Sequence, residues 1–306
     1  MSFDARWASK VKEKCVTSHD GVKITYQSIG EGTGKVVALG HGLGARLYAW
    51  EPVLDALVPD YRVITWHYRG LYASETPKKI RHLSIPNHAE DLRRIMDAEK
   101  IEKLSIVGWS MGVQVGLEFA ALYPERLDRL VLINGTYGHA LETGFQPLFH
   151  LPYATYMLHE AIDALRNKEW LAKRVQAMAS SQRIIEPLGT FYSRLRGNPQ
   201  FKSVLRQYVN DVFGPSFKNY LRLFQELDAH STYHNLKEIN HPVLVIWGDL
   251  DFLTPAYLSR RMKRRLKNSQ GYHRPLGTHF VHLEYPQKVP RRIKKYLDAD
   301  VLKVTD

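Results

Sequence analysis

The sequence has almost no cysteine, no long apolar run and fewer acidic than basic residues. A single cysteine among 306 residues, Cys15, excludes an internal disulfide. No stretch approaches the roughly 18 consecutive apolar residues of a membrane-spanning helix, and the opening M-S-F-D-A-R-W-A-S-K has no apolar segment typical of an export signal. These absences argue against secretion and against a membrane span, so we expect a protein of the reducing cytoplasm.

The basic surplus, 43 Lys and Arg against 31 Asp and Glu, gives a net charge of +12. Its densest runs are residues 260–267 and 291–296. In the first run Leu258, Met262 and Leu266 recur every four residues, which predicts a helix with an apolar seam and a solvated basic face. An anionic surface or an acyl-carrier protein is the alternative explanation. No nucleic-acid motif accompanies the charge, so we expect no nucleic-acid partner.

Short apolar runs alternate with helical patterns along most of the chain. The helical patterns include an amphipathic one over 87–100, and the alternation predicts a mostly parallel sheet covered by helices on both faces. Ligands of such sheets bind at the carboxyl ends of the strands. The first two strands, joined through Asp20 and Gly21, read as a hairpin. The expected strands cover residues 14–18, 22–28, 35–39, 62–66, 104–107, 130–133, 243–247 and 270–276.

The strand pattern disappears between residues 138 and 240, where only helical periodicity is found. This predicts a core formed by residues 1–137 and 241–306 and a helical cap, or lid, formed by residues 138–240. The aromatic residues of the cap either line an apolar acyl pocket or form the core of the cap itself. They are Phe145, Phe149, Tyr153, Tyr156, Trp170, Phe191 and Tyr192. The tail, 301–306, is expected to fray.

The run L-S-I-V-G-W-S-M-G at 104–112 stops at a serine that has glycines two residues before and two after it. Placing Ser110 at the tip of a tight strand-to-helix turn strains its backbone and brings Gly108 and Gly112 into near contact. G-x-S-x-G is common by chance, but an apolar strand precedes this copy and a helical pattern follows it. The stretch therefore predicts a nucleophile at Ser110.

A second glycine-rich loop, Gly40-His41-Gly42-Leu43-Gly44, follows the third expected strand. Such a loop either presents backbone N–H groups to a site or simply makes a tight turn. An earlier segment, G-E-G-T-G-K, lacks the glycine spacing of a phosphate-binding loop, and Val36 stands where that loop needs Ser or Thr. Nucleotide binding is not expected.

Four short blocks of sequence, given at the end of this paragraph in chain order, resemble the α/β-hydrolase superfamily. The resemblance extends over nearly the whole chain outside the cap. The resemblance implies an α/β-hydrolase fold, with an eight-stranded, mostly parallel sheet flanked by helices and the cap inserted after the sixth strand. The order Ser, Asp, His along the chain is the one this fold uses. The blocks are H-G-L-G from His41, G-W-S-M-G from Gly108, G-D-L-D-F-L-T-P from Gly248 and G-T-H-F-V-H-L-E-Y-P from Gly277.

The resemblance assigns Ser110 as the nucleophile, His279 as the base and Asp251 as the acid that orients it. Asp249 is the rival acid. His282 falls at a variable position of the family pattern and is expected to be structural or to face the cap. The spacing of the two histidines could suggest a metal, but no third ligand accompanies them.

The family pattern also implies that the oxyanion is held by the backbone N–H groups of Leu43 and Met111. His41, Gly42 and Trp109, which flank these positions, are candidate substrate contacts. The chain departs from the family where His67 replaces the usual Asp before Arg-Gly and where Tyr72 replaces a common glycine. The expected eighth strand, 270–276, is also unusually polar.

These observations together predict a cytoplasmic serine hydrolase that cleaves the carboxylic ester of a small, apolar acyl substrate through an acyl-enzyme, without metal or organic cofactor. Thioesterase, lactonase, cofactor-free haloperoxidase or perhydrolase, and carbon–carbon bond hydrolase activities use the same triad and stay open. Serine at the elbow disfavours epoxide hydrolase and haloalkane dehalogenase activity. A non-enzymatic ligand-binding protein of this fold is the alternative from another class.

Overall fold

The computed structural model describes most of the chain, namely residues 6–31, 34–144, 153–179 and 200–299, with isolated residues between 181 and 198. The tail expected to fray, and the cap residues Phe145, Phe149 and Tyr192, lie outside the described residues. Within the described part, every helix is too short or too polar to cross a bilayer.

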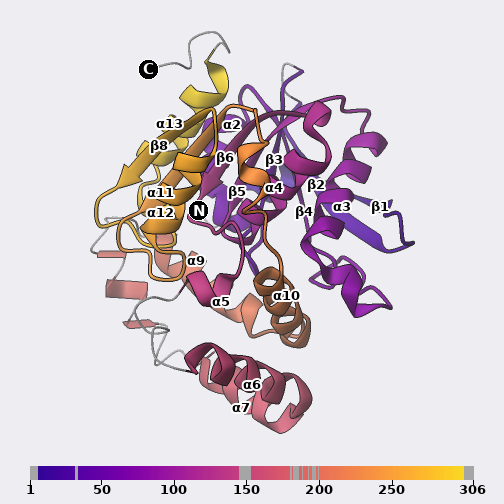
Figure 1. Cartoon of the computed structure of the whole chain (residues 1–306), viewed down its shortest axis with the longest axis vertical. Helices are drawn as coiled ribbons and strands as arrows, with labels where there is room; N and C mark the ends of the chain where they lie inside the picture. Colours follow the sequence, from indigo (N-terminus) through magenta and orange to yellow (C-terminus); the bar gives the residue numbers. More distant parts are fainter. Residues whose placement is uncertain are drawn as a thin grey trace.

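One eight-stranded sheet forms the centre of the molecule (Figure 1). Its spatial order is β1-β2-β4-β3-β5-β6-β7-β8. β2 is antiparallel to both β1 and β4, and the other neighbouring strands are parallel. This confirms the mostly parallel sheet and the opening hairpin. The strands are β1 (Val11–Thr17), β2 (Lys23–Ile29), β3 (Val36–Gly40), β4 (Arg62–Trp66), β5 (Leu104–Trp109), β6 (Leu127–Ile133), β7 (Val243–Gly248) and β8 (Ser269–Arg274).

The central strands are continuous apolar runs because both faces of the sheet are covered. Successive side chains of a strand point to opposite faces, so Ile106 joins the hydrophobic core on one face and Val107 joins the core on the other. On the first face lie α3 (Ile85–Ala98), α4 (Met111–Leu122) and α11 (Ala256–Arg265), and on the second lie α2 (Glu51–Leu57), α12 (Val281–Glu284) and α13 (Lys288–Asp298).

The polar eighth strand lies at the edge of the sheet, where one side is unpaired and its residues are half-buried or exposed. Charged and polar residues on an edge strand discourage pairing with another chain. The strand ends at Arg274, two residues earlier than expected. Pro275 cannot donate to a ladder, and Gly277 N–H closes a turn on the Arg274 carbonyl at 3.0 Å.

The basic helix α11 has the predicted seam. Leu258, Met262 and Leu266 are buried in the first core, while Arg260 and Lys263 are exposed. The charges of this helix therefore form a solvated outer face, as its periodicity indicated.

Only helices, and no strand, are described between β6 and β7, and we refer to this set as the inserted helices. In Figure 1, α5, α9 and α10 lie close to the sheet, whereas α6 and α7 lie farther from it. Leu141, Ile162, Phe217 and Leu221 form a small core among them. The inserted helices are α5 (Ala140–Thr143), α6 (Ala154–Asn167), α7 (Glu169–Ala179), α9 (Gln200–Val212) and α10 (Phe217–Ala229).

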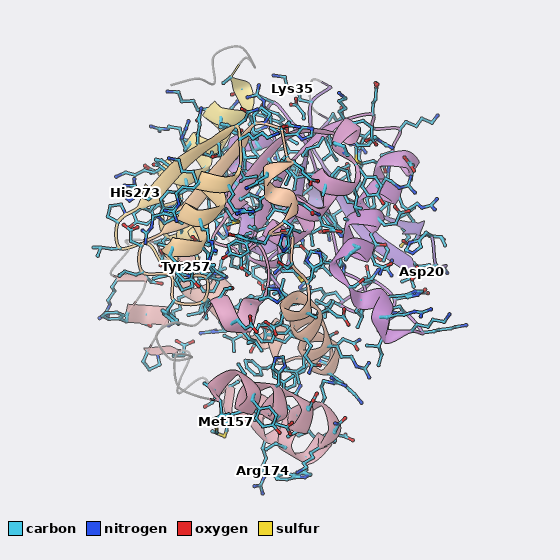
Figure 2. The ribbon with its side chains drawn as sticks, in the orientation of Figure 1. Asp20, Lys35, Met157, Arg174, Tyr257 and His273 are labelled. Atoms are coloured by element: carbon cyan, nitrogen blue, oxygen red, sulfur yellow. The ribbon has the colours of Figure 1, made fainter. Side chains whose placement is uncertain are left out.

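Four aromatic side chains expected in a pocket or in the core of the cap are instead exposed. Tyr153 is 80% exposed, Tyr156 64%, Trp170 59% and Phe191 62%, so the expected place in the core of the cap is wrong for them. Phe191 does line an open cavity, with Glu186 and Arg194. The core of the inserted helices is built from other positions, because α6 turns the face carrying Leu158, Ile162 and Leu165 inward. Figure 2 places Met157 and Arg174 of α6 and α7 at the end of the molecule farthest from the sheet.

Candidate active site

Ser110 occupies the turn between β5 and α4, as the motif predicts. Its φ of 56° and ψ of −114° are strained for a residue with a side chain. The turn is held by two hydrogen bonds, from Ser110 N–H to the Ile133 carbonyl and from Gly112 N–H to the His41 carbonyl, both at 3.0 Å. The Ser110 side chain is partly exposed at this point.

The two motif glycines are required by close backbone contact. A Cβ on Gly108 would lie 2.2 Å from the Gly112 carbonyl oxygen. One on Gly112 would lie 2.1 Å from the Gly40 carbonyl oxygen. Neither position accommodates a side chain without moving β3 or β5.

Asp251 and His279 meet at the carboxyl end of β7. Asp251 Oδ2 lies 2.9 Å from His279 Nδ1 and accepts the Thr254 hydroxyl at 2.7 Å. Asp251 Oδ1 accepts the backbone N–H groups of Leu253 at 3.0 Å and Thr254 at 2.9 Å. These donors fix the orientation of the carboxylate, and a carboxylate at Nδ1 orients the ring so that Nε2 can act as the base.

The rival acid and the second histidine lie elsewhere. The Asp249 side chain is 37% exposed and lies 3.3 Å from His273 Nδ1 at the edge of the sheet. His282 is fully buried, and its Nε2 donates to the Ala49 carbonyl at 3.1 Å. Burial lowers the pKa of His282 to about 3, so its ring is neutral. Of its two expected positions, the structural one is observed. Within the described residues, no group of three or more His, Cys, Asp or Glu side chains is arranged to hold a metal ion.

Trp109 connects the elbow to His279. Its ring N–H donates to the His279 carbonyl at 2.9 Å, and the two ring centroids are 5.6 Å apart. In the described part of the chain, the Ser110 hydroxyl forms no hydrogen bond, and the His279 ring is bonded through Nδ1 alone. Catalytic hydrogen bonds are often long without substrate and shorten when it binds. The Nε2 atom of His279 is therefore available to a hydroxyl or to substrate.

The loop of residues 41–44 follows β3 beside the elbow. His41 is buried, its Nδ1 accepts the Trp50 ring N–H at 2.9 Å, and its Nε2 lies 2.6 Å from Thr65 Oγ1. Burial lowers the pKa of His41 to about 3, so Nε2 carries the only ring proton and donates it to Thr65. Gly42 lies against the Trp109 ring, where a Cβ would be 2.9 Å away. The buried side chains of His41 and Trp109 thus pack beneath the loop, on the side of the protein interior.

Two backbone donors remain free at this point. Among the described residues, neither Leu43 N–H nor Met111 N–H donates to a carbonyl or to a side chain. Met111 is the first residue of α4, where the positive end of the helix dipole lies. Such unsatisfied donors favour negative charge.

An apolar cavity of about 210 Å³ opens beside His279. Two of its lining residues, Phe201 and Leu205, come from α9, and the others come from the loops that follow β7 and β8. The latter are Asp251, Phe252, Leu253, Thr278, His279 and Phe280.

Sequence reasoning did not assign two residues that organise this site. The Thr254 hydroxyl bonds to Asp251 and lies 3.3 Å from His279 Nδ1. Asn134 has a φ of 40°, accepts Gly248 N–H at 2.9 Å and donates to the Thr278 carbonyl at 2.6 Å. Both are short polar residues in the loops that follow predicted strands at their carboxyl ends, and this position was the signal that could have identified them.

The two departures from the family pattern in the β4 loop lie side by side. Tyr72 has a φ of 54°, the left-handed conformation that glycine favours, and its ring centroid is 5.4 Å from that of His67. Burial lowers the pKa of His67 to about 4. The Tyr72 hydroxyl donates to the Gly44 carbonyl at 2.7 Å, so the strained residue supports the glycine loop.

A family profile described as alpha/beta hydrolase fold matches residues 35–286. The chain belongs to the α/β-hydrolase-fold family. Among curated proteins it is 26% identical, over 93% of its length and 98% of the other, to a putative 2-succinyl-6-hydroxy-2,4-cyclohexadiene-1-carboxylate synthase of Bacillus subtilis. It is also 26% identical, over 87% and 92%, to a putative carbamate hydrolase RutD of Caulobacter segnis.

Solved structures show the same fold. The chain aligns with the enol-lactonase of Burkholderia xenovorans at a TM-score of 0.73 and 22% identity, covering 94% of this chain and all of the other. At this identity the likeness concerns the architecture, and the chemistry has to be inferred from the site itself.

Proposed function

We propose that this α/β-hydrolase-fold protein is a serine hydrolase that cleaves carboxylic esters through an acyl-enzyme. The observation that carries the proposal is the buried Asp251–His279 pair, with 2.9 Å between Oδ2 and Nδ1, which the bond from Trp109 to the His279 carbonyl joins to the strained turn that presents Ser110. A serine hydroxyl needs a base and a group that orients the base. Both are supplied here by the loops that follow β7 and β8.

In the proposed reaction, Ser110 Oγ attacks the ester carbonyl and passes its proton to His279 Nε2. Asp251 stabilises the resulting imidazolium through Nδ1. The tetrahedral oxyanion accepts hydrogen bonds from the free N–H groups of Leu43 and Met111. Collapse expels the alcohol, which takes the proton from His279, and a water molecule then repeats the sequence on the acyl-enzyme.

The cavity beside His279 supports a small apolar group on the substrate. Its volume of about 210 Å³ favours a short acyl or alcohol group over a long one. Its lining by Phe201, Phe252 and Phe280 favours an apolar group over a polar one. No step of this reaction requires a metal or an organic cofactor.

Burst kinetics test the proposal. Nitrophenyl esters of graded acyl length should give a burst of nitrophenol equal to the enzyme concentration, and a fluorophosphonate should label Ser110. Ser110→Ala should abolish both and lower kcat by at least ~10³-fold while the fold stays intact. A wild-type protein that shows neither burst nor labelling contradicts the proposal and favours a ligand-binding role.

The bond that is cleaved is tested by the same enzyme on a substrate panel. Thioesters, lactones, carbamates, perhydrolysis of acids and carbon–carbon bond substrates should be compared with esters. Carbamates belong in the panel because a relative at 26% identity is named a putative carbamate hydrolase. We expect the highest kcat/KM for a short-chain ester.

A further inference from the structure

Four successive carbonyl groups of the loop 41–44 are each held by a hydrogen bond. The His41 carbonyl accepts the Tyr68 hydroxyl at 2.8 Å as well as Gly112 N–H. The Gly42 carbonyl accepts Ala45 N–H at 2.9 Å. The next two accept tyrosine hydroxyls, as the following paragraphs describe. Each peptide plane of the loop is thus fixed through its oxygen.

The hydrogen bonds to the loop carbonyls determine the direction of Leu43 N–H. The Leu43 N–H shares its rigid peptide plane with the Gly42 carbonyl. That plane can turn about its own Cα–Cα axis by opposite changes in ψ of Gly42 and φ of Leu43, and the bond from Ala45 N–H to the Gly42 carbonyl opposes this directly. The bonds to the His41 and Leu43 carbonyls hold the two neighbouring planes and so fix the Cα atoms at the ends of that axis. A free donor can serve an oxyanion only if it is already oriented before the charge develops. The carbonyl tethers are therefore part of what prepares the donor.

One of these tethers comes from the inserted helices. The Tyr208 hydroxyl of α9 donates to the Leu43 carbonyl at 3.1 Å. The Tyr72 hydroxyl, which holds the Gly44 carbonyl, comes instead from the core. The position of the Leu43–Gly44 peptide, which follows Leu43 N–H in the chain, thus depends on α9.

A charged contact one turn along α9 reinforces this link. Asp211 pairs with Arg46 through two parallel bonds, Nε to Oδ2 at 2.9 Å and Nη2 to Oδ1 at 2.8 Å. The guanidinium also lies 4.9 Å from the centroid of the Tyr72 ring. A two-bond Arg–carboxylate pair fixes orientation as well as distance. α9 consequently holds the carboxyl-terminal half of the loop, at Leu43, and the chain just beyond it, at Arg46.

Packing leaves little room for the loop to adjust by itself. A Cβ on Gly44, whose φ is +78°, would lie 2.7 Å from Val212 and 2.9 Å from Tyr220. The inserted helices therefore lie directly against the loop backbone, and a displacement of α9 would release two of the contacts that hold it.

We propose that Tyr208 and Asp211 are positioning residues through which the docking of α9 orients Leu43 N–H for catalysis. The inference rests on the proposed function, since it assigns a role to the oxyanion donor of that reaction. Its consequence is that the inserted helices contribute to the rate of the chemical step as well as to the choice of substrate.

Tyr208→Phe tests the proposal because it removes one oxygen and leaves the ring. Amide exchange of the loop peptide should become faster, and kcat on the best nitrophenyl ester should fall about 5- to 30-fold with KM little changed. Losing an oxyanion donor outright costs about 10²–10³-fold, and a loosened donor costs less. Asp211→Asn should act in the same direction.

Tyr257→Phe is the matched control. Its hydroxyl donates to the Thr143 carbonyl at 2.6 Å and so joins α11 to α5 without touching the loop; Figure 2 shows Tyr257 between the sheet and the inserted helices. We expect unchanged loop exchange and unchanged kcat in this variant, with both variants showing similar melting temperatures.

Three outcomes overturn the inference. These are unchanged loop exchange in Tyr208→Phe, faster exchange without a fall in kcat, and equal effects in Tyr208→Phe and Tyr257→Phe. If the wild type cleaves no ester, the proposed function fails separately, and the exchange comparison alone then decides whether α9 holds the loop.

Discussion

At the scale of single residues, the environment of each side chain separates the acid from its rival. Two carboxylates follow β7 within three residues, and sequence alone leaves a choice between them. Asp251 is buried and receives three donors besides His279, whereas Asp249 is partly solvated beside His273. Several donors around a buried carboxylate fix it in one orientation.

Replacing the two acids should therefore give unequal results. Asp251→Asn should lower kcat by about 10³-fold or more, because the amide cannot stabilise the imidazolium at Nδ1. The kcat of Asp249→Asn should stay within about 2-fold of the wild-type value, since the exposed Asp249–His273 pair contributes little. Steady-state kinetics on one nitrophenyl ester measures both. The reverse ranking would reassign the acid to Asp249.

At the scale of elements, the elbow depends on three backbones in close contact. β3, β5 and the first turn of α4 meet at Gly40, Gly108 and Gly112. The strain at Ser110 persists because the hydrogen bonds of Ser110 N–H and Gly112 N–H fix the turn from both sides.

Gly112→Ala should destabilise the protein by at least about 3 kcal/mol, because its Cβ meets a backbone oxygen that has no room to move. Gly34→Ala is the control. Gly34 has a φ of +87°, but no atom lies within 4 Å of the point that its Cβ would occupy, so its cost should be only about 1 kcal/mol. Urea denaturation compares the two. Equal losses would mean that the contact at the elbow relaxes easily.

At the scale of the whole molecule, buried neutral histidines tie stability to pH. Burial lowers the pKa of His41, His88 and His282 from 6.5 to about 3. Below pH 6.5 the unfolded chain binds protons at these residues, while the folded chain does not until about pH 3. The unfolded state then holds more protons, so stability falls as the pH is lowered through this window.

His88→Gln should reduce that dependence. His88 lies on α3, and its Nε2 is 3.1 Å from the Leu83 carbonyl, a contact that a glutamine amide can replace. Between about pH 4 and 5.5, the slope of unfolding free energy against pH should drop by up to about 1.4 kcal/mol per pH unit. Denaturation at several pH values measures the slope. Identical slopes in variant and wild type would show that His88 is charged in the folded protein.

The fold was largely predictable because the central strands are apolar on both faces and are separated by clear helical patterns. The motif glycines, Ser110 and the two later blocks were predictable because each has a local chemical signature. The cap aromatics were not: Tyr156 and Trp170 look like core residues in sequence, but α6 and α7 expose them. The basic faces still have no tested partner, and an anionic surface or an acyl-carrier protein stays a prediction.

By itself the sequence determined the sheet and the elbow and pointed to Ser110, to His279 and to two possible acids, since strand periodicity and short motifs are local properties. Tertiary structure decided the rest. It placed Asp251 rather than Asp249 against His279, buried His41 and Trp109 behind the loop, and brought Tyr208 onto the Leu43 carbonyl. Residues 43 and 208 are far apart in the chain, and only the packing of α9 against the glycine loop puts a hydroxyl where that carbonyl points.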